Sequence, residues 1–120
     1  KLEFHPYIAP DESFLVFDAI DREDGFGAND LYISYRDQDG SWLPARNLGP
    51  IVNTEFSDMK PRMTADGKYL FFASDRHDRG GGLSEPVDYA RSRELLNGPG
   101  NGSQDIYWID ASAALSVGEN

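Results

Sequence analysis

The chain has 120 residues, the length of one ordinary domain, and its 11 Lys and Arg against 21 Asp and Glu give a net charge of −10. This acidic balance argues against binding to nucleic acid or to an anionic membrane surface, since both need a basic patch. Seven Phe, six Tyr and two Trp argue against disorder, and the absence of Cys excludes disulfides and Cys-ligated zinc.

The first half of the chain predicts short strands separated by turns, over residues 4–8, 14–19 and 31–35, with a weaker strand over 42–48. The run from Phe14 to Ala19 is apolar on both faces, which is typical of a strand buried on both sides. Pro10 and Asp11 indicate a tight turn between the first two strands. Pro44 cannot donate a backbone hydrogen bond, so the fourth strand belongs at a sheet edge.

The second half predicts strands over residues 59–63, 69–74 and 106–109, with a turn at Asp66-Gly67 between the first two. The apolar run 69–74 again predicts a strand buried on both sides. One helix is predicted over 86–96, with Pro86 at its start and Asn97-Gly98 at its end. Residues 111–120 are predicted to be a C-terminal tail. No apolar run is long enough to cross a membrane, so we expect no membrane insertion.

The two halves are copies of one unit. The segment from Pro6 to Phe17 aligns with 61–72 at an offset of 55, and 29–33 aligns with 104–108 at an offset of 75. The second copy therefore carries about 20 extra residues, which we place at 77–103. Shared positions predicted to maintain the repeat are Asp11, Asp66, Gly67, Asp30, Asp105, Tyr32 and Tyr107.

The repeat predicts an all-β fold of antiparallel four-stranded units, as in the blades of a β-propeller. The first unit spans 1–53, and the second spans 54–110 with its insertion. A β-sandwich stays open as an alternative, whereas a β-helix would need a much shorter period. We expect each of Asp30 and Asp105, which precede a strand, to accept hydrogen bonds from the adjacent loop.

The motifs of the second copy, Ala65-Asp66-Gly67 before an apolar strand, Ser74-Asp75-Arg76 after it, and later Asp105-Ile106-Tyr107, resemble the WD-repeat-like blades of TolB-type periplasmic proteins. The first copy departs from this pattern, because Glu12 replaces the turn Gly and one extra residue precedes Asp21-Arg22. The resemblance implies a propeller, a periplasmic or other extracytoplasmic location, and a protein- or ligand-binding scaffold. It implies no single activity.

Seven predicted strands amount to less than two blades, whereas propellers close with about four to eight. Two blades alone would leave apolar pairs such as Phe14/Val16 or Tyr69/Phe71 partly exposed. Three arrangements stay open: a piece of a longer propeller, a ring completed by several copies of the chain, or two sheets packed on each other without a propeller.

Catalytic and metal chemistry finds little support in the residues. His5 and His77 are the two histidines, and their expected roles are a strand position and a solvated loop. Calcium is a minor candidate, because acidic side chains gather around two glycines in one segment, although their spacing does not match a calcium-binding loop. These residues are Asp18, Asp21, Glu23, Asp24, Asn29 and Asp30.

Four of the eleven Lys and Arg residues of this acidic chain cluster at the insertion. This cluster predicts a flap that binds a partner or an anionic ligand, with Arg76, Arg79, Tyr89, Arg91 and Arg93 as its binding residues. The leading hypothesis is a non-enzymatic module that acts by binding another protein or a second copy of itself. The alternative is a fragment of a propeller enzyme, such as a glycoside hydrolase or a peptidase-associated propeller.

Overall fold

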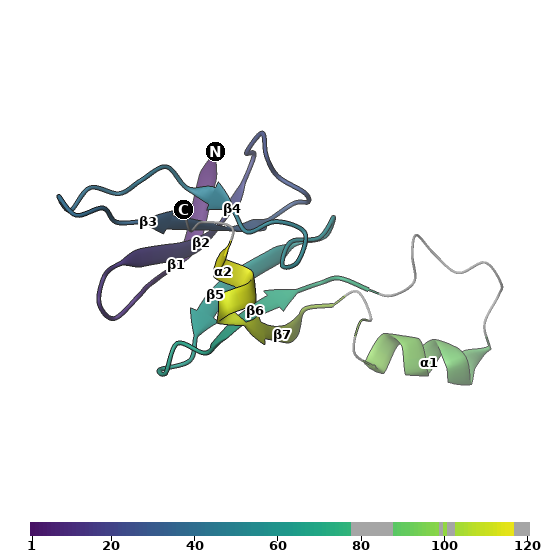
Figure 1. Cartoon of the computed structure of the whole chain (residues 1–120). Helices are drawn as coiled ribbons and strands as arrows, with labels where there is room; N and C mark the ends of the chain where they lie inside the picture. The colour runs from purple at the N-terminus through teal and green to yellow at the C-terminus, as the bar shows by residue number, and fades with distance from the viewer. Residues whose placement is uncertain (78–87, 99, 101–102, 117–120) are drawn as a thin grey trace.

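A computed structural model describes residues 1–77, 88–98, 100 and 103–116. Within these residues the chain is mostly β and forms two antiparallel sheets, joined by the segment 48–57 (Figure 1). The seven strands are those that the sequence predicts, with bounds that shift by one or two residues except at the fourth.

The first sheet has the strand order β1-β2-β3-β4. Its strands are β1 (Leu2–Ile8), β2 (Phe14–Ile20), β3 (Asp30–Tyr35) and β4 (Arg46–Asn47). The fourth strand is shorter than predicted, because only an isolated bridge between Arg36 and Trp42 precedes it. It lies at the sheet edge, next to β3, as Pro44 predicts.

The second sheet has the order β5-β6-β7 among the described residues. Its strands are β5 (Asp58–Met63), β6 (Tyr69–Ser74) and β7 (Asp105–Asp110). The first strand of each sheet carries a β-bulge at the same place in the repeat, where His5 and Lys60 both have positive φ, of 48° and 56°.

The core lies between the two sheets. The first sheet contributes Val16, Leu31 and Ile33, which are fully buried, and the second contributes Leu70 and Phe72. Strand β5 runs beside β1 and β2. The prediction that the strand 69–74 is buried on both sides is wrong, because only the face with Leu70, Phe72 and Ser74 is buried. Of the pair Phe14 and Val16, Val16 is fully buried in this core and Phe14 is half-buried against it.

Two helices accompany the sheets. The predicted helix is α1 (Tyr89–Asn97), capped by the Asp88 side chain, which accepts from the Arg91 backbone N–H at 2.8 Å. Figure 1 shows α1 at a distance from both sheets. The expected tail instead begins with α2 (Ala111–Leu115), whose Ala111, Ala114 and Leu115 join the core. No helix among the described residues has the length and hydrophobicity needed to cross a bilayer.

The backbone repeats as closely as the sequence. Ala9 N–H donates to Phe14 O at 3.0 Å, and its equivalent Thr64 N–H donates to Tyr69 O at 3.0 Å. At the far end of each unit, Arg36 N–H donates to Ser13 O at 2.8 Å, and Ala111 N–H donates to Lys68 O at the same distance. The two sheets are therefore two copies of one structural unit.

Candidate functional site

The second sheet exposes a continuous apolar surface. We call it the β7 face and define it by Tyr69, Phe71, Ile106 and Trp108. Ile106 is 77 % exposed and Trp108 63 %. Strand alternation places these two side chains on the face opposite the core, and cross-strand pairing places Trp108 beside Phe71. The Tyr69 and Trp108 rings meet edge to face at 5.3 Å.

The first sheet exposes a second apolar surface on its own outer side. We call it the β1 face and define it by Pro6, Ile8, Leu15 and Phe17, since Ile8 pairs with Leu15 across the two strands. Pro6 and Ile8 are exposed, Leu15 is half-buried, and Phe17 forms the buried floor. A hollow of about 210 Å³ on this side is lined by Glu3, Phe4, Pro6, Leu15 and Phe17.

Each exposed face has a buried counterpart in the other copy. On the β7 face, Phe71, Ile106 and Trp108 stand where the first copy has Val16, Leu31 and Ile33, which are fully buried between the sheets. On the β1 face, Pro6 and Leu15 stand where the second copy has Pro61 and Leu70, which are also buried. Both outer faces of the molecule therefore contain residues whose equivalents in the other copy are buried between the sheets.

An arginine–aromatic stack recurs in the two copies. The Arg22 guanidinium lies 4.5 Å from the Tyr32 ring centre, and Tyr32 stacks on Phe17 at 6.0 Å. The equivalent Arg76 lies 4.7 Å from Tyr107, which stacks on Phe72 at 6.1 Å. The extra residue of the first copy is absorbed at Asp21, which has a positive φ of 58°.

The two stacks differ in the acid that accompanies them. Arg76 donates to Asp58 at 2.7 Å, and this carboxylate is fully buried and also accepts from the Thr54 N–H and hydroxyl. At the equivalent positions, Arg22 donates to Glu3 at 3.4 Å, and the Glu3 side chain is 58 % exposed. Arg76 is therefore a structural residue of the second sheet, and it lies apart from α1.

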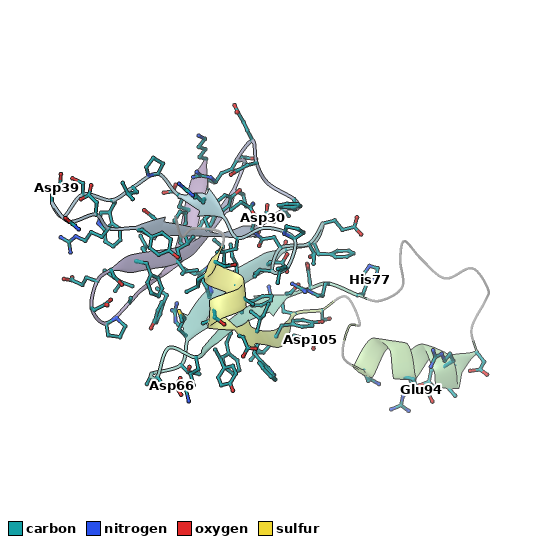
Figure 2. All side chains as sticks on the ribbon, in the orientation of Figure 1. Asp30, Asp39, Asp66, His77, Glu94 and Asp105 are labelled. Atoms are coloured by element: carbon teal, nitrogen blue, oxygen red, sulfur yellow. The ribbon has the colours of Figure 1, made fainter. Side chains whose placement is uncertain are left out.

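The remaining predicted binding residues lie on or near the insertion. Tyr89 is 78 % exposed, with the Arg93 guanidinium 5.9 Å from its ring centre. Arg91 pairs with Glu94 at 3.0 Å, on the outer helix labelled by Glu94 in Figure 2. Arg79 lies outside the described residues. The structure thus brings together Tyr89, Arg91 and Arg93 on α1, and ligand binding there stays a prediction.

Asp30 and Asp105 begin β3 and β7, where Figure 2 labels them. Asp30 accepts from the Phe26 N–H at 2.6 Å, and Asp105 accepts from the Gly100 N–H at 2.8 Å. The expectation that each accepts a hydrogen bond from the adjacent loop is confirmed. Burial raises the pKa of Asp30, because the loss of water outweighs the backbone hydrogen bonds from the loop. Burial also raises the pKa of the neighbouring Tyr32 to about 12.

A buried carboxylate connects the two sheets. Asp18 is fully buried and accepts from His5 Nδ1 at 2.8 Å, from Asn29 Nδ2 at 3.0 Å and, across the sheet boundary, from the Lys60 backbone N–H at 3.1 Å. The bulge at Lys60 aims this N–H at the first sheet. Asp18 therefore links the two sheets through the Lys60 N–H, and His5 contacts this carboxylate from within the first sheet, which is more than the simple strand position expected for His5.

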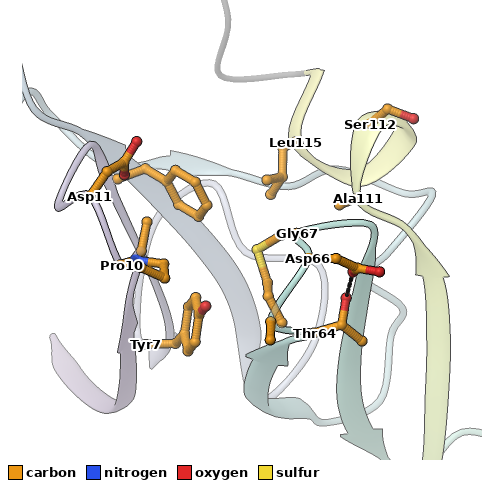
Figure 3. A pocket seen from close by; sticks show the side chains of 13 residues that line it. Tyr7, Pro10, Asp11, Thr64, Asp66, Gly67, Ala111, Ser112 and Leu115 are labelled. Atoms are coloured by element: carbon orange, nitrogen blue, oxygen red, sulfur yellow. Dashed lines mark hydrogen bonds between the residues drawn. The ribbon is translucent and has the colours of Figure 1, made fainter.

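A cavity of about 500 Å³ opens between the two hairpin turns and α2 (Figure 3). Its walls include Tyr7, Phe14, Met63 and Leu115. The Asp66 carboxylate at its rim accepts from the Thr64 hydroxyl at 2.6 Å, as the dashed line in Figure 3 shows. This hydrogen bond lowers the pKa of Asp66, and a bond from Ser13 lowers that of the equivalent Asp11. Both carboxylates are thus engaged by their own turns.

The acidic segment considered for calcium is distributed over these structural contacts. Asp24 accepts from the Tyr32 hydroxyl at 3.0 Å, while Asp18 and Asp30 take part in the contacts given above. In the part of the chain that the structure describes, no group of three or more His, Asp or Glu could hold a metal ion. Calcium binding stays a prediction without a defined set of ligands.

Comparisons of the chain with protein-family models, with curated proteins and with solved structures gave no match. The resemblance to TolB-type blades therefore rests on the sequence motifs.

Only part of the β7 face can be recognised in the sequence. The blade count predicts partial exposure of Tyr69 and Phe71, but it does not single out Ile106 and Trp108, which are the most exposed members of this face. The signal was present in the alternation Asp105-Ile106-Tyr107-Trp108, because in a strand buried on one side only one alternate set is covered.

Proposed function

We propose that this chain is a non-enzymatic binding module built from two β-propeller-type blades, and that it acts through protein–protein contacts made by its β1 and β7 faces. One observation carries this proposal: Trp108 and Ile106 are among the most exposed large apolar side chains of the described residues, whereas their equivalents in the first copy are fully buried. An apolar surface of this kind is typical of an interaction site.

The blade architecture is supported by the repeat. Each copy is an antiparallel meander whose first strand carries the bulge and whose central strand is apolar on both faces. The sheets also pack face to face and head to tail. The face of the first sheet that carries Val16 and Ile33 contacts the non-equivalent face of the second sheet, which carries Leu70 and Phe72. The cavity supports a binding role over a catalytic one, since its two rim carboxylates are engaged in hydrogen bonds within their own turns.

The test uses Trp108 as a reporter of the β7 face. The Trp42→Phe variant leaves Trp108 as the sole tryptophan, because the chain has two. At nanomolar concentration we expect acrylamide to quench its fluorescence readily, with an emission maximum typical of a wet indole. A blue-shifted and protected tryptophan in the monomer would show that the chain covers this face itself, and the proposal would then be wrong. Trp108→Phe, which leaves Trp42 as the sole tryptophan, is measured in parallel to give the signal of Trp42 alone.

A further inference from the structure

We infer that the partner of the β7 face is the β1 face of a second copy of this chain, so that copies associate head to tail. This inference rests on the proposed function, because it names the occupant of the same surfaces. In this assembly, two copies would contact each other in the same way as the two sheets contact each other within one copy.

The contact within the chain provides the template. Val16, Leu31 and Ile33 of the first sheet face Leu70 and Phe72 of the second across a single core. Each side of this interface has equivalents in the other repeat. The equivalents of Val16, Leu31 and Ile33 are Phe71, Ile106 and Trp108, which belong to the β7 face. The equivalents of Leu70 and Phe72 are Leu15 and Phe17, which belong to the β1 face. The two open faces are therefore the two sides of one interface.

The sizes of the side chains fit this exchange. The β7 face carries larger residues than its buried template, with Phe71 in place of Val16 and Trp108 in place of Ile33. The β1 face offers a hollow of about 210 Å³ between Phe4, Leu15 and Phe17, where a larger side chain can enter. In the second sheet, the equivalent surface is filled, since Pro61 and Leu70 are fully buried.

A paired acid and arginine mark the same position at both interfaces. Asp58 and Arg76 form a pair at 2.7 Å that is covered where the two sheets meet. Their equivalents Glu3 and Arg22 pair at 3.4 Å on the open side of the first sheet. The β1 face thus has an acid–arginine pair at the position where the packed interface between the sheets also has one.

One hydrogen bond between the two sheets of a copy has no equivalent in the proposed contact between copies. Within the chain, the Lys60 N–H donates to the buried Asp18. In the contact between copies the residue equivalent to Asp18 is Ala73, which has no acceptor side chain. We therefore expect association between copies to be weaker than the contact between sheets, and to depend on concentration.

Head-to-tail contacts use different surfaces on the two partners, so they generate a ring when the rotation closes. Since each copy supplies two units, roughly two to four copies would provide the four to eight blades of a closed propeller.

The test uses one charged variant on each face. Ile8→Lys disables the β1 face, Trp108→Lys disables the β7 face, and Ile51→Lys is the control, since Ile51 is 64 % exposed in the segment between the sheets. Sedimentation velocity follows the mass of each. We expect the control to associate like wild type, and each face variant to weaken association by about tenfold or more.

Mixing the two face variants is the decisive step. The Ile8→Lys copy keeps an intact β7 face and the Trp108→Lys copy keeps an intact β1 face, so an equimolar mixture should form a heterodimer that neither forms alone. If Ile8→Lys still dimerises while Trp108→Lys does not, the contact is symmetric and the inference is overturned. Circular dichroism checks that both variants fold.

Failure of this inference can be distinguished from failure of the proposed function. A wild-type chain that stays monomeric at millimolar concentration, with Trp108 readily quenched, overturns self-association but leaves the face open for another protein. A monomer whose Trp108 is protected overturns both.

Discussion

Glu12 and Gly67 occupy the same position in the two hairpin turns and share a left-handed backbone, with φ of 60° and 71°. Their N–H groups close equivalent turns, onto Ala9 O at 2.8 Å and Thr64 O at 2.9 Å. Glu12 is thus an L-residue in a conformation that glycine adopts without strain.

Glu12→Gly is therefore expected to leave stability unchanged or to raise it by up to about 1 kcal/mol, because relief of about 1–2 kcal/mol of backbone strain outweighs the entropy that glycine adds to the unfolded chain. The exposed contact of Glu12 with Arg36 at 3.5 Å contributes little. Urea denaturation measures the change. Gly67→Ala is the matched control and should destabilise by about 1–2 kcal/mol because alanine is strained at this positive φ. A clash does not contribute, since among the described atoms nothing lies within 4 Å of the added Cβ. A destabilised Glu12→Gly would contradict the equivalence of the turns.

The two arginine stacks allow a matched comparison of buried and exposed charge. Arg76→Met should cost about 3–5 kcal/mol, because it leaves the fully buried Asp58 carboxylate without its cation. Arg22→Met loses a similar contact with an aromatic ring but only exposed acids, so about 1 kcal/mol is expected. Chemical denaturation of both variants gives the difference. Adding Asp58→Asn to Arg76→Met should recover part of the loss, and equal costs for the two arginines would contradict this account.

The Asn53 side chain, in the segment between the sheets, forms two hydrogen bonds with the backbone of Leu31 in β3. It accepts from the Leu31 N–H at 2.7 Å and donates to Leu31 O at 3.0 Å, and Asn53 is almost completely buried. Asn53→Ala is expected to cost about 1–3 kcal/mol, because the buried Leu31 N–H loses its partner. Leu31 O keeps a hydrogen bond from the Leu48 N–H at 3.0 Å. Thermal and urea denaturation check this value. Asn97→Ala, at the exposed end of α1, is the control and should change stability by less than about 0.5 kcal/mol.

The raised pKa of Asp30 predicts a pH dependence with a definite sign. The folded state holds this proton more tightly than the unfolded state, so the free energy of unfolding falls as pH rises from the ordinary value of 3.8 through the folded pKa, and then levels off. Asp30→Asn lacks this loss, so its melting temperature relative to wild type should increase across that window.

Asp66→Asn provides the control of opposite sign. The lowered pKa of Asp66 stabilises the fold above pH 3.8 and is lost as pH falls through the folded pKa. The melting temperature of Asp66→Asn relative to wild type should therefore decrease as pH rises toward 3.8. Parallel pH profiles for the two variants would contradict the causes given for the two shifts.

The strands and the repeat could be predicted because they depend on local chemistry. Alternating apolar residues set the strands, and Pro10, Asp66 and Gly67 set the turns, so the offset of 55 residues in the sequence reappears as equivalent hydrogen bonds. The positions of Asp30 and Asp105 could be predicted for the same reason, because each acts on the loop that precedes it.

Features that depend on contacts between distant segments could not be predicted. The sequence of β6 has apolar residues on both faces but does not show which face another element covers. It therefore predicts burial on both sides, whereas in the structure only one face is buried. The helix α2 has five residues and weak signals of its own, and it forms where Ala111 and Leu115 reach the core. The Asn53 clamp and the tie from Lys60 to Asp18 likewise need the folded chain.

The measurement that tests the central claim most directly is the molar mass of the wild-type chain, followed by light scattering over a range of concentrations. The account predicts a mass that rises with concentration from 13.4 kDa toward a multiple set by roughly two to four copies, as β1 and β7 faces pair. A mass of 13.4 kDa at every concentration, up to the millimolar range, would contradict it.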